Sequence, residues 1–317
     1  MVAAVLAAVS LGALVSLAPR ALGLSQVPLL AQAVALRGVL ALAALGAGAV
    51  LLVLWALSRR RPRALLAAAV LLSVGAGHAG VLVARGLAAP PPDAREADLV
   101  VLSLNTLGGA SSPQHVARAA RAADADVLAL PETGADLAGE VARLLGPWSA
   151  WTGQRGSSPV GATSLVVADR LGPLEQVVAP RLALGAVSAA PVGDGGVLTA
   201  VHPPPPLPLA AGVGAWSADV AEAAAACRAT PGAVVAGDFN ATLDHAALAD
   251  LGPCVDAAAE VGAAGVATWP ASASRLLGAP IDHVLVDARA WRVLSVQVLD
   301  VGGSDHRALV VRLARRG

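Results

Sequence analysis

Residues 234–240 read Val-Val-Ala-Gly-Asp-Phe-Asn, a short apolar run followed by two polar side chains. The run predicts a buried strand, and Asp238 and Asn240 come just after its end. Open α/β sheets carry their functional sites at that end of a strand. An Asx turn uses the same residue types, so the meaning of this stretch depends on the segments around it.

Similar apolar runs recur along residues 98–314, separated by helical stretches and by Gly and Pro. Mixed strands and helices of this kind indicate an α/β domain. A helix is expected over Gln114–Ala123, with Pro113 in its first turn and Ser111 or Ser112 as its cap, and another over Ala215–Ala229. The other runs that predict strands are Leu99–Leu104, Val127–Leu130, Leu165–Ala168, Val197–Val201, His283–Val286 and Ala308–Leu313.

Polar residues border most of these predicted strands. They comprise carboxylates, amides and imidazoles, namely Asn105, Glu132, His202, Asp282, Asp305 and His306 beside the Asp238 and Asn240 already quoted. Oxygen ligands of this kind suit a hard divalent cation such as Mg²⁺. The two cysteines do not have the spacing of a structural zinc site, and the sequence has no Gly-x-Ser-x-Gly motif. Activated water is therefore the simplest nucleophile.

Two motifs, Gly237-Asp238-Phe239-Asn240 and Ser304-Asp305-His306, follow Asn105, Glu132 and His202 in a characteristic order. In this order the segments resemble the endonuclease/exonuclease/phosphatase superfamily, the deoxyribonuclease I-like fold, over residues 98–314. The resemblance implies two packed mixed β-sheets flanked by helices, a four-layer sandwich. It also implies cleavage of phosphoester bonds with Mg²⁺ (or Mn²⁺).

The resemblance assigns roles position by position. Glu132 would be the main metal ligand, with Asn105 and Asp305 completing or orienting the metal's shell. The implied catalytic residues are Asp238 to activate or position water, Asn240 to hold it or donate to the phosphate, His202 to stabilise the transition state, and His306 oriented by Asp282. Which group is the general base stays open.

The sequence departs from the family pattern at three places. Thr106 follows Asn105 where a second Asn is usual one position on, Pro131 replaces a Gln, and the chain has no Tyr for the phosphate. Arg155, Ser164 or Trp269 would fill that last place, or it stays empty. Trp269 lines a cleft or packs in the core. Residues without motif context, His115, Asp244 and His245, are expected at the surface.

The composition is unusual for a soluble protein, because 56% of the 317 residues are hydrophobic and 14% are charged, against about 25% charged in ordinary domains. Residues 1–90 contain seven Arg and no acid, whereas the rest carries 15 Arg and 22 acids, a net charge of −7. Apolar stretches of about 20 residues can cross a bilayer. We expect about three transmembrane helices in residues 1–86, at about 2–18, 38–57 and 64–83, then a Pro-rich linker at 87–97 and a catalytic domain at 98–317.

The arginines predict the orientation of these spans. Arg59, Arg60, Arg61 and Arg63 cluster between the second and third spans, which marks that loop as cytoplasmic. The domain then lies outside the cytoplasm, together with Arg20, Arg37 and Arg85. A cleaved signal peptide at residues 1–19 is the alternative for the first span, but no basic region precedes it. The chain is thus expected to be a membrane-anchored, multi-pass bacterial member of the family, in the cell membrane. His78, inside the third span, is expected to pack against a neighbouring helix or reach the interface.

The charge of the domain bears on its substrate. A protein that binds long DNA replaces counterions with Lys and Arg, but this domain is acidic and contains no Lys. A small phosphoester or a lipid head group is therefore favoured over long DNA, although Arg155, Arg275 or Arg307 could hold one phosphodiester. The alternatives are a surface nuclease acting on external DNA and a binding module with little turnover. Cys227 and Cys254 either form a disulfide, as an oxidising compartment permits, or stay as two buried thiols.

Overall fold

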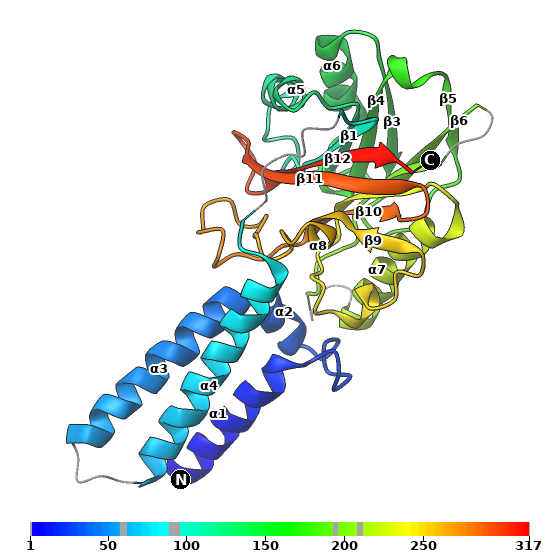
Figure 1. Ribbon diagram of the computed structural model, residues 1–317. Coiled ribbons are helices and arrows are strands. Elements are labelled where there is room, and N and C mark those ends of the chain that lie inside the picture. Colours follow the sequence, from blue (N-terminus) through cyan, green and yellow to red (C-terminus); the bar gives the residue numbers. More distant parts are fainter. Residues whose placement is uncertain (1, 58–61, 89–95, 193–195, 208–211, 317) are drawn as a thin grey trace.

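The computed structural model describes residues 2–57, 62–88, 96–192, 196–207 and 212–316. A bundle of N-terminal helices extends from one side of a larger domain built on two β-sheets (Figure 1). Two of the expected features, the loop of Arg59–Arg61 and most of the Pro-rich linker (residues 89–95), lie outside the described residues.

The first sheet has six strands in the order β11-β12-β1-β2-β4-β3. Its central pair, β1 and β2, is parallel, and all other neighbours are antiparallel. The strands are β1 (Leu99–Ser103), β2 (Val127–Pro131), β3 (Trp148–Gln154), β4 (Ala162–Ala168), β11 (Trp291–Asp300) and β12 (Arg307–Arg315).

The second sheet repeats this plan with the order β5-β6-β7-β8-β10-β9. Here β7 and β8 form the parallel pair, and the remaining pairs are antiparallel. The strands are β5 (Leu174–Val177), β6 (Ala186–Pro191), β7 (Leu198–Val201), β8 (Val234–Asp238), β9 (Cys254–Asp256) and β10 (Asp282–Asp287).

Alternation along the central strands explains how the layers stack, because successive side chains of a strand point to opposite faces. Leu99 and Val101 lie in the apolar core between the two sheets, whereas Val100 and Leu102 pack under α5 and α6. On the far side, α7 covers the second sheet. The helices of this domain are α5 (Pro113–Ala122), α6 (Ala135–Leu145), α7 (Gly212–Ala229) and α8 (Ala257–Glu260), with single 3₁₀ turns at Pro159–Gly161, Asp169–Leu171 and Ala246–Leu248.

This four-layer arrangement confirms the predicted fold. Each of the seven predicted strands is present, and Ser112 is the residue that caps α5, accepting a hydrogen bond from the backbone N–H of His115. Five strands were not predicted by the apolar runs: β3, β5, β6, β9 and β11. They are half-buried, short or interrupted by polar residues, so their sequences lack a continuous apolar run.

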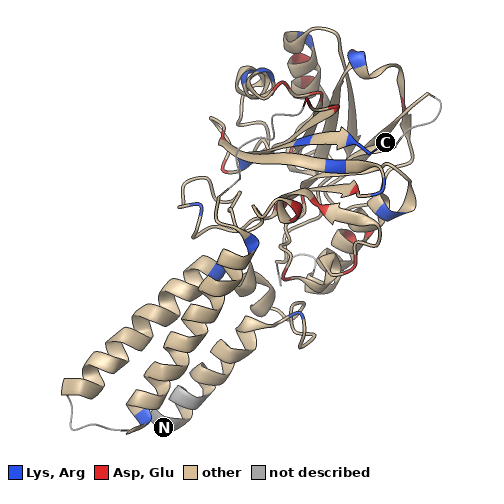
Figure 2. Cartoon of the chain, viewed as in Figure 1, with Lys and Arg blue, Asp and Glu red and all other residues tan. Residues whose placement is uncertain are grey.

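The N-terminal region contains four helices, α1 (Val2–Leu17), α2 (Leu30–Ala35), α3 (Arg37–Leu57) and α4 (Pro62–Arg85). Among the described residues, α3 and α4 are long and apolar enough to cross a membrane. The 16 residues of α1 rise about 24 Å, less than the about 30 Å of a hydrocarbon core. The expected three spans therefore become two candidate spans, and Figure 2 shows their sides almost free of charge.

A buried ion-pair cluster joins these helices to the domain. Both carboxylate oxygens of Asp244 bind Arg37, at the start of α3, and Arg85, at the end of α4, with N–O distances of 2.5 to 2.8 Å. Arg37 also contacts His78 Nδ1 at 2.9 Å, and His78 Nε2 lies 3.0 Å from Ser16 Oγ, so His78 packs between helices. Burial alone would raise the pKa of Asp244, but the two arginines hold it at about 2.

The expectation that Asp244 and His245 lie at the surface was wrong. Both are buried, because the segment before α3 covers them: His245 Nε2 lies 2.9 Å from the Ala31 carbonyl oxygen, and the Ala246 N–H donates to Ser25 Oγ. His115, the third residue of that group, is half-buried. The partners of these residues are about 200 positions away, beyond the reach of a local sequence pattern.

Two glycines allow the helices to approach the domain this closely. A Cβ at Gly38 would lie 1.7 Å from the carbonyl oxygen of Leu276, and a Cβ at Gly86 would lie 1.3 Å from that of Gly262. Gly86 also has a φ of 84°, which is unfavourable for other residues, and its carbonyl accepts a hydrogen bond from Gly265. At these two glycines the helices therefore contact the domain backbone to backbone.

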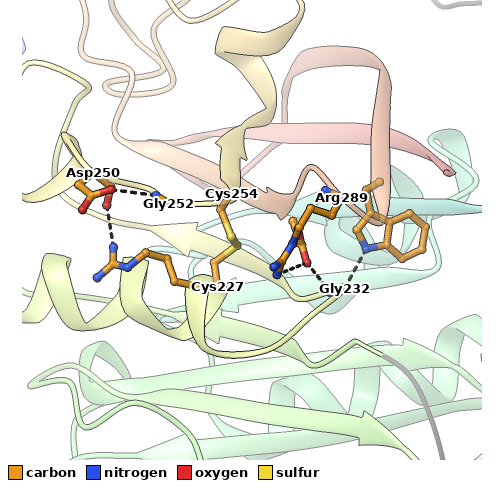
Figure 3. Close-up of a disulfide and its surroundings, with 9 residues drawn as sticks. Cys227, Gly232, Asp250, Gly252, Cys254 and Arg289 are labelled. Atoms are coloured by element: carbon orange, nitrogen blue, oxygen red, sulfur yellow. Dashed lines mark hydrogen bonds and ion pairs between the residues drawn. A yellow bond between two sulfur atoms is a disulfide. The ribbon is translucent and has the colours of Figure 1, made fainter.

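A disulfide between Cys227 and Cys254 ties the end of α7 to β9, across the segment that contains Asp238 and Asn240 (Figure 3). The structure thus selects the bridge from the two states that the sequence left open. Beside it, Arg228 donates to the carbonyl oxygen of Asp250.

We expect Asp244→Asn to lower the free energy of unfolding by about 3 kcal/mol, because removing one partner of a buried ion pair leaves the other charge uncompensated. The measurement is thermal unfolding of the full chain in detergent. Glu140→Gln is the matched control, since its ion pair with Arg143 is at the surface and surface pairs contribute little.

The same pair of proteins gives a pH test. Because the pKa of Asp244 is lowered to about 2, its carboxylate stabilises the fold above a pH of about 4, and this contribution is lost as pH falls toward 2. The difference between wild type and Asp244→Asn should shrink over that range. A difference that is constant from pH 7 to pH 2 would contradict the ion-pair assignment.

The disulfide predicts that the unreduced protein has no reactive thiol in denaturant and that reduction releases two. A disulfide closing a loop of 27 residues contributes about 3 kcal/mol, so the double variant Cys227→Ser, Cys254→Ser should unfold correspondingly earlier. Two thiols titrated before reduction would rule out the bridge.

Candidate active site

Four of the predicted site residues lie at one edge of the two sheets because of the parallel strand pairs. Asn105 and Glu132 follow β1 and β2, which are parallel neighbours, so their ends meet. His202 follows β7, and Asp238 ends β8, in the parallel pair of the second sheet. The two pairs face each other across the end of the inter-sheet core.

Antiparallel neighbours bring the remaining residues to the same edge. Asp282 begins β10 and is in register with Asp238 on β8. Asp305 and His306 precede β12, which runs antiparallel to β1. The first residues of strands that begin at this edge therefore lie beside the last residues of strands that end there.

Asn105 connects the two sheets. Its side-chain nitrogen donates to Glu132 Oε1 and to Asp238 Oδ2, both at 3.1 Å, and its oxygen accepts from the Leu107 N–H at 2.9 Å. Asn105 and Asp238 are each 2% exposed, so these bonds replace those that water would make. The amide therefore orients two carboxylates at once.

His306 has a carboxylate on each side of its ring. Nδ1 lies 2.9 Å from Asp282 Oδ2, and Nε2 lies 3.6 Å from Asp238 Oδ2. His202 approaches the same carboxylate, with Nε2 3.7 Å from Asp238 Oδ2 and 4.0 Å from Glu132 Oε1. Two imidazoles therefore converge on Asp238.

Burial and charge set the protonation of these groups. Burial tends to lower the pKa of His306, but the charges of Asp282 and Asp238 outweigh it and raise that pKa to about 10. Burial also lowers the pKa of His202 and raises that of Asp238. At neutral pH the site thus holds a cationic His306 and a neutral His202.

Asn240 and Asp305 have fixed positions beside this group. The Asn240 N–H donates to Asp238 Oδ1 at 2.8 Å, and its side chain donates to the Pro203 carbonyl at 3.0 Å. Asp305 Oδ2 accepts from Trp269 Nε1 at 3.0 Å, whereas Asp305 Oδ1 is buried without a described partner.

A cavity of about 460 Å³ opens onto the site. Asp282 lies outside it and contacts His306, and the other seven predicted site residues line it: Asn105, Glu132, His202, Asp238, Asn240, Asp305 and His306. The structure therefore brings the whole predicted set together. Among the described lining residues there is no Arg, and the chain has no Lys.

Of the three substitutes proposed for the family's Tyr, Trp269 lines this cavity. Ser164 is buried and hydrogen-bonded to the Thr133 carbonyl, and Arg155 is exposed on a loop. Arg307 does not face the cavity either: it is 4% exposed and binds Asp300 and nearby backbone carbonyls. Arg275 pairs with Asp300 at the surface.

A possible cation site differs from the ligands expected from the sequence. Donor atoms of Asp238, Asp282 and His306 lie within 4.8 Å of one another. However, His306 Nδ1 is already bonded to Asp282. The expected ligands, Asn105, Glu132 and Asp305, border the same cavity.

Two supporting residues, Thr106 and Ser304, were assigned no role from the sequence. Thr106 Oγ1 donates to the Glu132 carbonyl and thereby supports Glu132 in a left-handed conformation, φ 56°. Ser304 Oγ donates to the Asn105 carbonyl and accepts from the His306 N–H, which ties two site segments together. Ser304 stood within the quoted motif, but Thr106 counted as a departure from it.

Two facing mixed sheets, with carboxylates, amides and imidazoles at their common edge, define the deoxyribonuclease I-like class of proteins. Residues 102–306 match the model of the Endonuclease/Exonuclease/phosphatase family, and the chain belongs to this family. Comparison with curated protein sequences gives no match.

Solved structures share this fold at low sequence identity. The human Nocturnin catalytic domain with bound sulfate matches with a TM-score of 0.52 and 16% identity, over 71% of this chain and 96% of that one. An endonuclease/exonuclease/phosphatase from Beutenbergia cavernae matches with a TM-score of 0.51 and 19% identity, over 70% and 72%. D. rerio TDP2 complexed with a single-strand DNA product matches with a TM-score of 0.53 and 12% identity, over 68% and 98%.

We expect Asp282→Asn to lower the pKa of His306, since the Asp282 charge is the strongest of the effects that raise it. Titration of ¹³C-labelled histidine by NMR in the presence of a chelator measures this pKa. Asp256→Asn, beside the buried His283, is the matched control. An unchanged His306 resonance between pH 5 and 9 in Asp282→Asn would contradict the assignment.

Proposed function

We propose that the chain is a membrane-anchored, metal-dependent phosphoesterase that hydrolyses phosphodiester or phosphomonoester bonds with activated water. The observation that carries this proposal is the convergence of His202, Asp238 and His306, with Asp282 behind His306, on one cavity bordered by Asn105 and Glu132. The family supports phosphoester hydrolysis as the reaction class.

The donor set fits a hard divalent cation. The Glu132 and Asp305 carboxylates offer oxygen ligands, which Mg²⁺ prefers, and Asp305 Oδ1 is a buried oxygen without a described partner. The Asn105 oxygen accepts from the Leu107 N–H and keeps a second lone pair for a cation. We assign Mg²⁺ (or Mn²⁺) to Asn105, Glu132 and Asp305 because a cationic His306 has no lone pair to offer. A bound cation would supply Lewis-acid stabilisation of the phosphoryl oxygens.

The remaining groups, His306, Asp238 and His202, would transfer protons or stabilise charge. Cationic His306, held by Asp282, faces the cavity through Nε2 and can donate to a phosphate oxygen. Asp238 has a raised pKa and lies beside it, which suits a group that positions water or accepts its proton. Neutral His202 lies on the other side of Asp238 and can bond the transition state.

The location outside the cytoplasm rests on the helices and the disulfide. Candidate spans α3 and α4 have Arg37 and Arg85 at the end that contacts the domain, and the cluster Arg59–Arg61 belongs to the loop that joins their far ends. Positive loops remain in the cytoplasm. The disulfide is typical of an oxidising compartment.

A surface nuclease is the second candidate, because TDP2, which shares the fold, was solved with a single-strand DNA product. The acidic domain and the absence of Lys oppose tight binding of a long polyanion. A small phosphoester or a lipid head group is therefore the preferred substrate.

The full chain in detergent should hydrolyse bis-p-nitrophenyl phosphate with Mg²⁺, and excess chelator should abolish the reaction. Asp238→Ala and His306→Ala should each lower kcat by about 100-fold or more, since positioned acid–base groups contribute that much. Release of p-nitrophenol measures the rate.

His115→Ala and Asp219→Ala, which change the same residue types outside the cavity, should retain the wild-type rate. Equal rates in wild type, Asp238→Ala and His306→Ala would contradict the assigned site. Folded protein without any hydrolysis would favour a binding module.

A further inference from the structure

The cavity above the active site has an apolar wall that belongs to the N-terminal helices. Ala35 and Leu36, at the end of α2, line it together with Gln32. The opposite walls are also apolar, formed by Leu107, Val160, Leu184, Pro205, Leu207 and Ile281. The charged lining residues all belong to the predicted site, and most of the other lining residues are apolar.

This wall lies at the level where a membrane would begin. Leu36 directly precedes Arg37, the first residue of the candidate span α3. Figure 1 shows α2 between the helical bundle and the two-sheet domain. Gln32 Nε2 donates to the carbonyl oxygen of Pro206 on the facing loop, so the wall is joined to the far side of the cavity.

The wall is held firmly in place. Asp244 bonds Arg37 and Arg85 at the ends of both candidate spans, and Gly38 and Gly86 bring backbone against backbone. The active site therefore has a fixed height relative to α3 and α4, near the head groups of a bilayer that these helices cross.

The residues that line the cavity indicate which class of substrate it can bind. Leu107 and Leu207 are 44% and 51% exposed at the cavity, although exposed leucines gain no stability from water contact. Single-stranded nucleic acid is commonly bound by stacking its bases on several aromatic side chains, and among the described lining residues Trp269 is the one Trp, Tyr or Phe, the two imidazoles being at the reaction centre. Aliphatic walls beside a phosphate-directed site fit a hydrocarbon chain attached to a phosphate.

We infer that the substrate is a lipid phosphoester, with its phosphate at Asp238 and His306 and its hydrocarbon chain between Leu36, which follows α2, and Leu107 and Leu207 of the domain. This inference rests on the proposed phosphoesterase activity. The N-terminal helices then form part of the substrate site as well as an anchor.

The test uses the full chain in lipid nanodiscs with Mg²⁺ and a series of p-nitrophenyl alkyl phosphates, with methyl, butyl and octyl chains. Each methylene buried in the cavity should raise kcat/KM about fourfold, so the octyl ester should exceed the methyl ester by at least about 100-fold. Release of p-nitrophenol gives all three rates on the same scale.

Two variants separate the cavity from partitioning into the nanodisc. Leu36→Gln and Leu107→Gln should each reduce the octyl-to-methyl ratio of kcat/KM by about tenfold. Leu276→Gln is the matched control, because Leu276 is also 44% exposed but does not line the cavity, and it should keep the wild-type ratio. Wild type and all variants meet the same bilayer, so partitioning cancels.

The outcomes are distinct. No hydrolysis of these diesters or of the monoester p-nitrophenyl phosphate would overturn the proposed function itself. Hydrolysis of the methyl ester without a gain for octyl would overturn the lipid inference alone. If Leu36→Gln and Leu107→Gln both keep the wild-type octyl-to-methyl ratio of kcat/KM, the lipid inference is also overturned. The preference would then arise outside this cavity.

Discussion

The dry core between the two sheets is the constraint on which the rest of the structure depends. Apolar side chains of both sheets, among them those of β1, β2, β8 and β10, fill this core, so a charged side chain in mid-strand would lose its hydrogen bonds. In these four strands the carboxylates therefore lie at the strand ends, as Asp238, Asp282 and Asp287 do. One parallel pair in each sheet ends at the same edge, so the residues at these strand ends meet there. The apolar core thus confines the site to this edge.

The same constraint explains why the site could be predicted from the sequence. Each site residue borders an apolar run, as Asp238 does after residues 234–236, and such runs are visible without a structure. The edge strands were less accessible: β3 reads Trp-Ser-Ala-Trp-Thr-Gly-Gln and is half-buried, so no apolar run marks it. Order along the chain indicated which residues meet, but not the bonds between them, such as Asn105 to both Glu132 and Asp238.

The contact between helices and domain could not be predicted, for a different physical reason. Asp244 finds its partner Arg37 across 207 positions, and no periodicity links an acid in a loop to the first residue of an apolar helix. Its sequence environment is that of a surface residue. Only the placement of α3 and α4 against the domain turns it into a buried charge, whose pKa is then lowered by two arginines.

The positively and negatively charged side chains of this protein lie in different places. Three buried or half-buried arginines hold the architecture together: Arg37 and Arg85 fix the helices, and Arg307 holds the loop near Trp269. The cavity is left with the imidazoles and an excess of carboxylates. A site of this composition repels a phosphate unless a cation offsets the carboxylates, and it offers a polyanion little to bind outside the reacting group. The proposed cation would offset these carboxylates, and the apolar walls would supply binding energy for a hydrocarbon group.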